Sequence, residues 1–167
     1  MANTLSAEVE AELIARHKAT VRTTLSLFVG VVLLCVLAYV SQKFLTQRPN
    51  PSLDIAVRIT ILIFGLGAIA LRRTRFAQMR LQDIAAIQGA SGLIVSLQRT
   101  TLLVSLIGAA VAIIGFLATI YTGAPLYTYQ AGVVAAAVLL YGYPVRNAWQ
   151  QAVRRFASDL GPNPSND

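Results

Sequence analysis

Asp54 and Arg58 are the residues most suited to chemistry in this hydrophobic chain, because both are charged and both fall at the start of an apolar segment. Their spacing of four residues would place the two side chains on one face of a helix, where they can form an ion pair. Charged groups inside a membrane are costly and often mark a path for an ion or a substrate. The pair has two interpretations, an ion pair at the outer mouth of such a path or a structural pair near a helix end. The second is favoured, because Arg58 lies about one turn into the segment and can extend back to the membrane surface.

Groupings of residues that support catalysis are absent from the sequence. His17 is the only histidine and Cys35 the only cysteine, so neither a thiolate metal site nor an intramolecular disulfide can be assembled. No serine has a histidine partner on the same side of the membrane, and no glycine-rich loop precedes a helix in the phosphate-binding form. We predict that the protein is not an enzyme, has no catalytic residues, and binds neither a metal nor a cofactor.

The composition is typical of a membrane protein. Of the 167 residues, 56% are hydrophobic and 13% are charged, whereas roughly a quarter of the residues in soluble domains are charged. The net charge of +7 could indicate nucleic acid as the partner of a soluble protein, but here the basic residues flank apolar segments. We therefore expect contact with the bilayer and with anionic lipid headgroups at the cytoplasmic face, and no contact with nucleic acid.

Four apolar segments, residues 24–40, 53–71, 102–121 and 126–145, are long enough to cross a bilayer as helices. Pro49 and Pro51 separate the first two segments, and a turn with Gly123 and Pro125 separates the last two. The sequence thus predicts an all-α integral membrane protein, a bundle of four transmembrane helices arranged as two hairpins.

The two hairpins have the features of an internal repeat. Each begins with the same four letters, RTTL, at residues 22–25 and 99–102. Both copies would start on the same side of the membrane, so we predict parallel repeats related by an axis along the membrane normal. Convergence is the alternative, because any two hairpins with basic ends resemble each other.

Basic residues are distributed unequally between the two sides of this arrangement. One side carries Lys43, Arg48 and Arg58. The other side carries eleven, namely Arg16, Lys18, Arg22, Arg72, Arg73, Arg75, Arg80, Arg99, Arg146, Arg154 and Arg155. Since lysine and arginine are enriched in cytoplasmic loops, we predict a multi-pass protein of the plasma (inner) membrane with both termini in the cytoplasm.

This topology divides the chain into five parts. They are a cytoplasmic N-terminal helix (1–21), the first transmembrane hairpin (22–71), a cytoplasmic basic connector (72–98), the second hairpin (99–145), and a cytoplasmic basic helix with a disordered tail (146–167). The N-terminal helix is either a lead-in to the first span or an amphipathic surface helix. In the connector, a helix is expected to break or bend at Gly89 and Gly92. Pro144 is expected to kink the last span near its inner end.

Small residues predict where the helices pack. Gly108 and Ala112 in the third segment are four residues apart, as are Gly132 and Ala136 in the fourth, so each pair shares a helix face. Such faces let helices in lipid approach closely. We expect these four residues to pack the second hairpin, with contact to a partner subunit or another copy as the alternative. The first two segments are bulkier and are expected to face lipid.

The lack of acidic groups deep in the apolar segments limits the function. Proton-coupled and sodium-coupled carriers commonly use Asp, Glu or His inside the membrane, and none lies in the interior of a segment here. We therefore predict a non-catalytic structural or accessory subunit of a larger membrane complex, whose partners are other membrane subunits. The alternative is a homo-oligomeric channel or transporter without carboxylate ion coupling, in which Arg58 attracts anions near the outer mouth.

Overall fold

The computed structural model describes residues 7–46, 51–75, 78–145, 147 and 149–151, and it describes side chains for residues 10–46, 51–74, 91–145, 147 and 149–151. Within these ranges the regular structure is entirely helical. The elements are α1 (Ala7–Ser41), α2 (Pro51–Arg75), α3 (Gln78–Thr122) and α4 (Leu126–Gly142). The prediction of an all-α protein is confirmed.

Three of the described helices are long and apolar enough to cross a membrane. These are α1, α2 and the part of α3 from Ser91 onwards. The remaining helix, α4, is apolar and has 17 residues, which makes it about 25 Å long against a hydrocarbon core of about 30 Å. The chain therefore has the helices of a membrane protein, while the fourth span stays a prediction.

Prolines explain where α2 begins and where α4 ends. Pro51 is the first residue of α2, a position where its missing N–H leaves no helical hydrogen bond unmade. Tyr143 follows the last residue of α4 with φ −57° and ψ 128°, the extended conformation that a residue before proline prefers. Pro144 therefore ends α4, and the expected kink within a longer helix is wrong.

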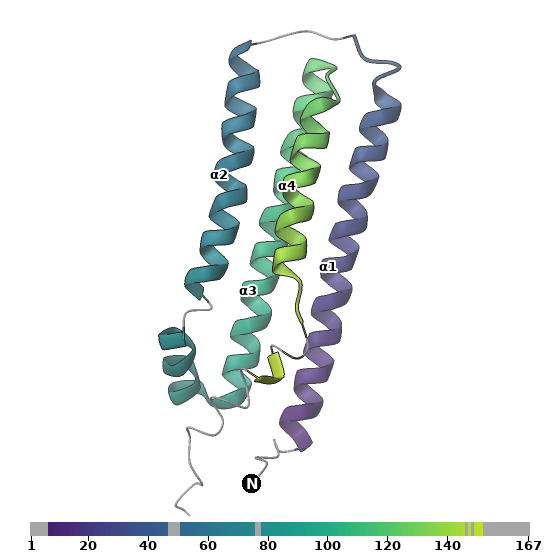
Figure 1. Cartoon of the computed structure of the whole chain (residues 1–167). Helices are drawn as coiled ribbons and strands as arrows, with labels where there is room; N and C mark the ends of the chain where they lie inside the picture. Colours follow the sequence, from purple (N-terminus) through teal and green to yellow (C-terminus); the bar gives the residue numbers. More distant parts are fainter. Residues whose placement is uncertain (1–6, 47–50, 76–77, 146, 148, 152–167) are drawn as a thin grey trace, which may run out of the picture.

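The helices α3 and α4 form the centre of the bundle. They are joined by a tight turn at Gly123, which has a φ of 73° that suits glycine, and whose N–H donates to the carbonyl oxygen of Thr119 at 2.8 Å. In Figure 1, α4 lies in front of α3 and between α1 and α2. In the most apolar part of α3, 44% of residues are buried, against 17% in α1 and 22% in α2. The two outer helices therefore expose most of their apolar surface.

Small residues bring α3 and α4 together. A Cβ at Gly115 would overlap the Cβ of Ala131 and would lie 2.8 Å from the carbonyl oxygen of Tyr127, so the two backbones nearly touch at this point. A Cβ at Gly108 would lie 3.2 Å from Cγ1 of Val138. Burying apolar surface between two helices stabilises them little in lipid, because lipid is itself apolar. Close van der Waals contact of this kind therefore stabilises the pair.

The two hairpins pack differently. α3 contacts α4 directly, whereas α1 and α2 lie on opposite sides of α4 in Figure 1. α1 contributes Val31 to a buried cluster with Ala112 and Leu139, while α2 contributes Ile61 to another that contains Ala131. The similar letters at the two hairpin starts thus do not give the helices similar neighbours, and the internal repeat stays a prediction.

The connector between the hairpins is helical on both sides of residues 76–77. α2 continues to Arg75, and α3 runs without interruption from Gln78 to Thr122. Gly89 and Gly92 therefore do not end a helix, since a glycine costs only about 1 kcal/mol in a helix interior. The first, teal turns of α3 nevertheless lie beside the rest of that helix in Figure 1, and not in line with it. The helix of the connector is bent but not broken.

The predicted N-terminal helix is the beginning of α1. Because α1 is continuous from Ala7 to Ser41, its first turns lead directly into the apolar part, which is the lead-in arrangement. The predicted C-terminal helix and tail lie outside the described residues apart from residues 147 and 149–151, and residues 1–6 lie outside them as well.

We expect Gly115→Ala to destabilise the bundle and Gly30→Ala to leave it intact. The new methyl group at Gly115 would meet backbone and Ala131, whereas a Cβ at Gly30 has no atom within 4 Å. Overpacking costs about 1–3 kcal/mol, while alanine at an open helical position is favoured over glycine by up to about 1 kcal/mol. The midpoint of unfolding by SDS in mixed micelles measures both changes. Equal midpoints for the two variants would contradict the close approach of α3 and α4.

Candidate functional site

Basic side chains gather at one end of the bundle, which we call the basic end. It is the end where α1 begins and α2 finishes, and the opposite end, with the α1–α2 and α3–α4 connections, is the loop end (Figure 1). Among the described side chains, the loop end has Lys43 and Arg58. The basic end has the half-buried Arg16 and Arg72 and the exposed Lys18, Arg22, Arg73 and Arg99.

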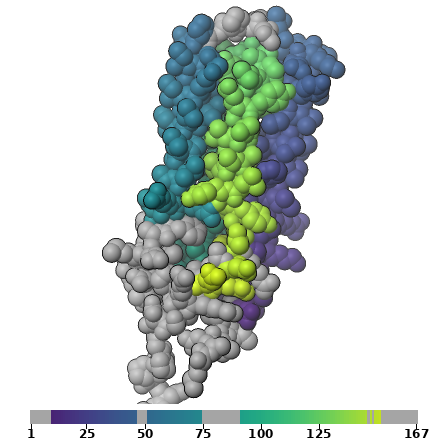
Figure 2. Space-filling view, viewed as in Figure 1, coloured from purple at the N-terminus to yellow at the C-terminus, as the bar shows by residue number. Residues whose placement is uncertain are grey.

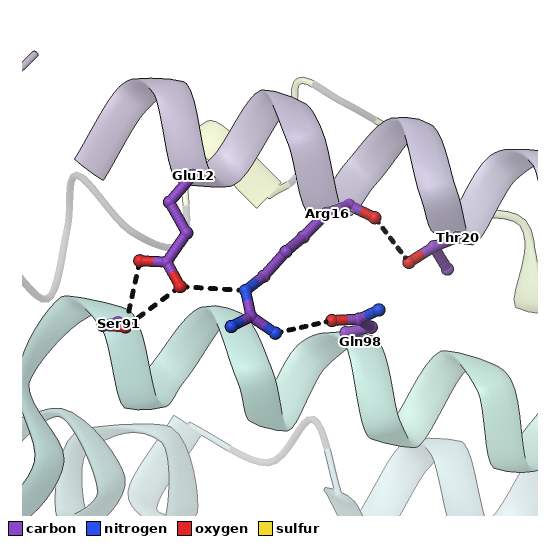
Figure 3. Close-up of polar contacts among 5 residues, drawn as sticks. All are labelled: Glu12, Arg16, Thr20, Ser91 and Gln98. Atoms are coloured by element: carbon purple, nitrogen blue, oxygen red, sulfur yellow. Dashed lines mark hydrogen bonds and ion pairs between the residues drawn. The ribbon is translucent and has the colours of Figure 1, made fainter. Parts of the chain in front are cut away.

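Four polar side chains join α1 to α3 at the basic end (Figure 3). Glu12 is central, because its carboxylate accepts hydrogen bonds from Ser91 Oγ, at 3.2 Å to Oε1 and 3.0 Å to Oε2. It also accepts one from Arg16 Nε at 2.9 Å. Arg16 Nη1 in turn donates to Gln98 Oε1 at 3.0 Å. We call these four residues the α1–α3 junction, and it links the start of α1 to about two turns of α3.

The spacing of the junction residues follows from helix geometry. The two on α1 are four residues apart and the two on α3 are seven apart, so each pair lies on one helix face. Apolar neighbours beside them are buried, with at most 2% of their surface exposed: Leu13, Leu93, Ile94 and Leu97. The side chains of Arg16 and Glu12 stay 38% and 28% exposed. The ion pair itself therefore adds little to the stability of the bundle. The buried apolar side chains beside it add more.

The segment that follows α4 packs on α1 at the same end. His17 Nε2 lies 2.9 Å from the carbonyl oxygen of Pro144 and donates to it in the tautomer that carries its proton on Nε2. The His17 ring also meets Trp149 edge-on, with 5.7 Å between ring centroids and 82° between ring planes. Trp149 is buried. The single histidine thus serves to hold the chain beyond α4 against α1.

A cation–π contact ties α2 to α4 near the basic end. The guanidinium carbon of Arg72 lies 4.6 Å from the centroid of the Tyr141 ring. Such a contact attracts a guanidinium to the electron-rich face of an aromatic ring. All four helices are therefore connected at this end through polar or aromatic side chains.

Hydroxyl groups pair between helices deeper in the bundle. Thr24 on α1 and Ser105 on α3 are buried with their oxygens 3.4 Å apart. Near the loop end, the Thr128 hydroxyl donates to Thr119 Oγ1 at 2.7 Å, and Thr119 Oγ1 donates to the carbonyl oxygen of Ala124 at 3.0 Å. Every buried side-chain nitrogen and oxygen among the described residues has a hydrogen-bond partner. The polar groups of the interior thus serve helix packing.

Asp54 and Arg58 lie on α2 near the loop end. Arg58 Nε donates to Asp54 Oδ1 at 2.8 Å, and the two side chains are 48% and 33% exposed, respectively. The phenol of Tyr127 on α4 lies next to the Asp54 carboxylate. The pair is thus at the surface between α2 and α4 and not on the axis of the bundle, while its predicted role at the mouth of an anion path stays a prediction.

The four predicted packing residues lie on two different contacts. Gly108 faces α4, whereas a Cβ at Gly132 would lie 2.7 Å from Sγ of Cys35 on α1. Ala112 is buried and Ala136 is half-buried. Gly132 therefore lets α1 approach α4, and does not serve the contact between α3 and α4.

Sequence reasoning missed the closest contact and the α1–α3 junction. Gly115 lies seven residues after Gly108 and so continues the same helix face, a signal that was available. Ser91 and Gln98 are polar residues in a mostly apolar stretch, which indicates that they have polar partners but does not identify these partners. Glu12 is separated from Ser91 by 79 residues, and no local pattern connects them.

The described residues offer helix contacts and a cationic end. Among the described residues, no group of three His, Cys, Asp or Glu side chains could hold a metal ion. No family model, curated protein or solved structure matches the chain.

Removing the carboxylate of the junction should loosen the start of α1. We expect Glu12→Ala and Ser91→Ala each to lower the free energy of unfolding by about 0.5–1 kcal/mol, because these side chains are partly exposed. The double variant should cost less than the sum of the two, since both substitutions remove the same contact. Glu10→Ala, at an exposed position of the same helix, is the control and should change little. Full additivity of the two substitutions would show that Glu12 and Ser91 do not interact.

Proposed function

We propose that the protein is a non-catalytic membrane protein with four transmembrane helices that acts as a structural or accessory subunit of a larger membrane complex. The observation that carries the proposal is a contrast between the interior and the exterior of the described bundle. The buried polar groups are all hydrogen-bonded, while the outer surface exposes many large apolar side chains. The interior groups pair with one another, which leaves the outer faces of the helices for interactions with other molecules.

The outer faces of α1 and α2 supply the surface for assembly. Leu33 on α1 is 56% exposed, and Ile63 and Leu66 on α2 are 62% and 65% exposed. Apolar patches of this extent are rare on soluble monomers and indicate contact with lipid or with other proteins. Because α1 and α2 flank the central pair, both faces are open to helices of a partner.

The basic end supports an orientation with both termini in the cytoplasm of a plasma (inner) membrane. Described lysines and arginines are concentrated there, as the positive-inside rule requires of a cytoplasmic side. A cationic surface at that level would also attract the anionic lipid headgroups of the cytoplasmic leaflet. In this orientation the second hairpin spans the bilayer only if α4 crosses it with 17 residues. Tyr141 and Tyr143 would then lie near the cytoplasmic interface.

Labelling of introduced cysteines tests this orientation. In a Cys35→Ala background, cysteines at Phe44 and Tyr121, which are 82% and 72% exposed at the loop end, should react with an impermeant thiol reagent added to intact cells. A cysteine at Lys18, exposed at the basic end, should react only after the membrane is opened. Labelling of the Lys18 position alone in intact cells would reverse the orientation, and labelling of Phe44 without Tyr121 would contradict the crossing of the membrane by the second hairpin, α3 and α4.

Gentle extraction tests the role as a subunit. The tagged chain, solubilised with its surrounding lipid, should purify in a fixed ratio with unrelated membrane proteins, and tagging one of those proteins should recover this chain. Removing the chain should lower the amount of the assembled complex, and restoring it should bring the complex back. An unrelated tagged protein of four spans is the control for chance capture. A homo-oligomer without other proteins would contradict the proposal and support the channel or transporter instead.

A further inference from the structure

A groove of about 470 Å³ opens between α2 and α4 toward the loop end. The seam between these two helices faces the viewer in Figure 2. Its polar lining consists of Arg58, Tyr129 and Gln130, and its apolar lining of Ile61, Leu62, Val133 and Val134. The groove thus combines a cation with a hydrophobic wall, a combination that suits an amphiphile.

The polar and apolar lining residues are ordered along the helices. On α2, Arg58 comes first from the loop end and Ile61 follows about one turn deeper; on α4, Gln130 comes first and Val134 follows one turn deeper. In both helices the polar residue is therefore nearer the membrane surface. A membrane lipid has the same order, with its headgroup outside and its acyl chains inside.

The groove is closed at its deeper end. A Cβ at Gly65 would lie 2.6 Å from Cγ1 of Val134, so α2 and α4 touch there. Gly65 lies seven residues after Arg58, about 10 Å along the helix. The groove can hold the first part of one acyl chain, while it is too short for the several turns of a second transmembrane helix.

The guanidinium of Arg58 is placed to bind an anion at the mouth of the groove. The Arg58 Nε donates to the carboxylate of Asp54, and this hydrogen bond fixes the direction of the guanidinium. The two terminal nitrogens of Arg58 can then donate to a second acceptor. Arginine binds phosphate through paired donors of this kind. Gln130 adds an amide that can donate to an ester or phosphate oxygen. Asp54 offsets part of the positive charge of Arg58. This favours an anion that is hydrogen-bonded to the guanidinium over anions that are attracted only by the net charge.

We propose that this groove binds one phospholipid of the leaflet at the loop end, with its phosphate on Arg58 and one acyl chain along Ile61 and Val133. The site lies at the opposite end from the basic surface and does not depend on the chain being a subunit of a complex. It gives the exposed Arg58 a partner of matching chemistry at the membrane surface.

Native mass spectrometry of the detergent-purified protein tests the site. The probes are dioleoyl phosphatidylglycerol, dioleoyl phosphatidylethanolamine and dioleoylglycerol, which has the chains but no phosphate. We expect one molecule of either phospholipid per chain and at least tenfold weaker binding of dioleoylglycerol. Equal binding of all three would overturn the role of Arg58, and no binding of any phospholipid to the wild-type protein would overturn the site.

Two pairs of variants locate the bound lipid. Arg58→Ala should weaken phospholipid binding at least tenfold, while Lys43→Ala, which removes a charge at the same end outside the groove, should not. Val133→Trp should fill the groove and abolish binding, whereas Leu140→Trp should not, although the two residues are similarly exposed on α4 at 71% and 66%. Arg58→Lys keeps the positive charge but loses the paired donors of the guanidinium, so this variant should bind phospholipid with intermediate strength. An intermediate result would distinguish the loss of phosphate contacts from misfolding.

Three results would count against the site. Equal loss in the Arg58→Ala and Lys43→Ala variants would indicate general attraction of anions, and equal loss in both tryptophan variants would place the lipid on the open surface of α4. Unchanged binding in the Arg58→Ala and Val133→Trp variants would place it elsewhere on the protein. Each variant is compared with the wild type by far-ultraviolet circular dichroism and elution volume before its lipid binding is compared.

Discussion

The close approach of α3 and α4 is the contact on which the rest of the bundle depends. At Gly115 the absence of a side chain lets the backbone of α3 meet Ala131 and the carbonyl oxygen of Tyr127. Lipid is as apolar as a leucine side chain, so helices in a bilayer gain from fitting together and little from leaving lipid. Once this pair has formed, it presents two flanks, and α1 and α2 each pack on one of them through branched side chains such as Val31 and Ile61.

Polar contacts are divided by depth along the bundle. In the interior they are hydroxyl groups that bond to each other or to backbone, as with Thr119 and Thr128, because an unpaired polar group away from water is costly. At the basic end they are charged or aromatic, as in the α1–α3 junction and the contact of His17 with Trp149. Charged groups are tolerated there because their side chains stay partly exposed, 38% for Arg16 and 28% for Glu12.

The surface of the molecule follows from this interior. With its hydrogen bonds satisfied inside, the described bundle offers its surroundings three kinds of surface: bare apolar helix faces, a cationic end, and the groove beside Arg58. The first kind suits helices of other proteins, the second suits anionic headgroups, and the third suits a phosphate with an attached acyl chain. In the proposed role as an accessory subunit, these surfaces would hold the parts of a larger complex together through shape and charge.

The sequence by itself determined those features that depend on neighbours along one helix. Hydrophobic length predicts the helices, Pro49 and Pro51 separate the first two of them, and the four-residue spacing of Asp54 and Arg58 predicts their ion pair. Tertiary structure alone decided which faces meet. Glu12 bonds to a residue 79 positions away, His17 to one 127 positions away, and Gly132 turned out to face α1 and not α3. The physical reason is that periodicity specifies which residues share a helix face, while the neighbour of that face is set by how closely whole helices can approach one another.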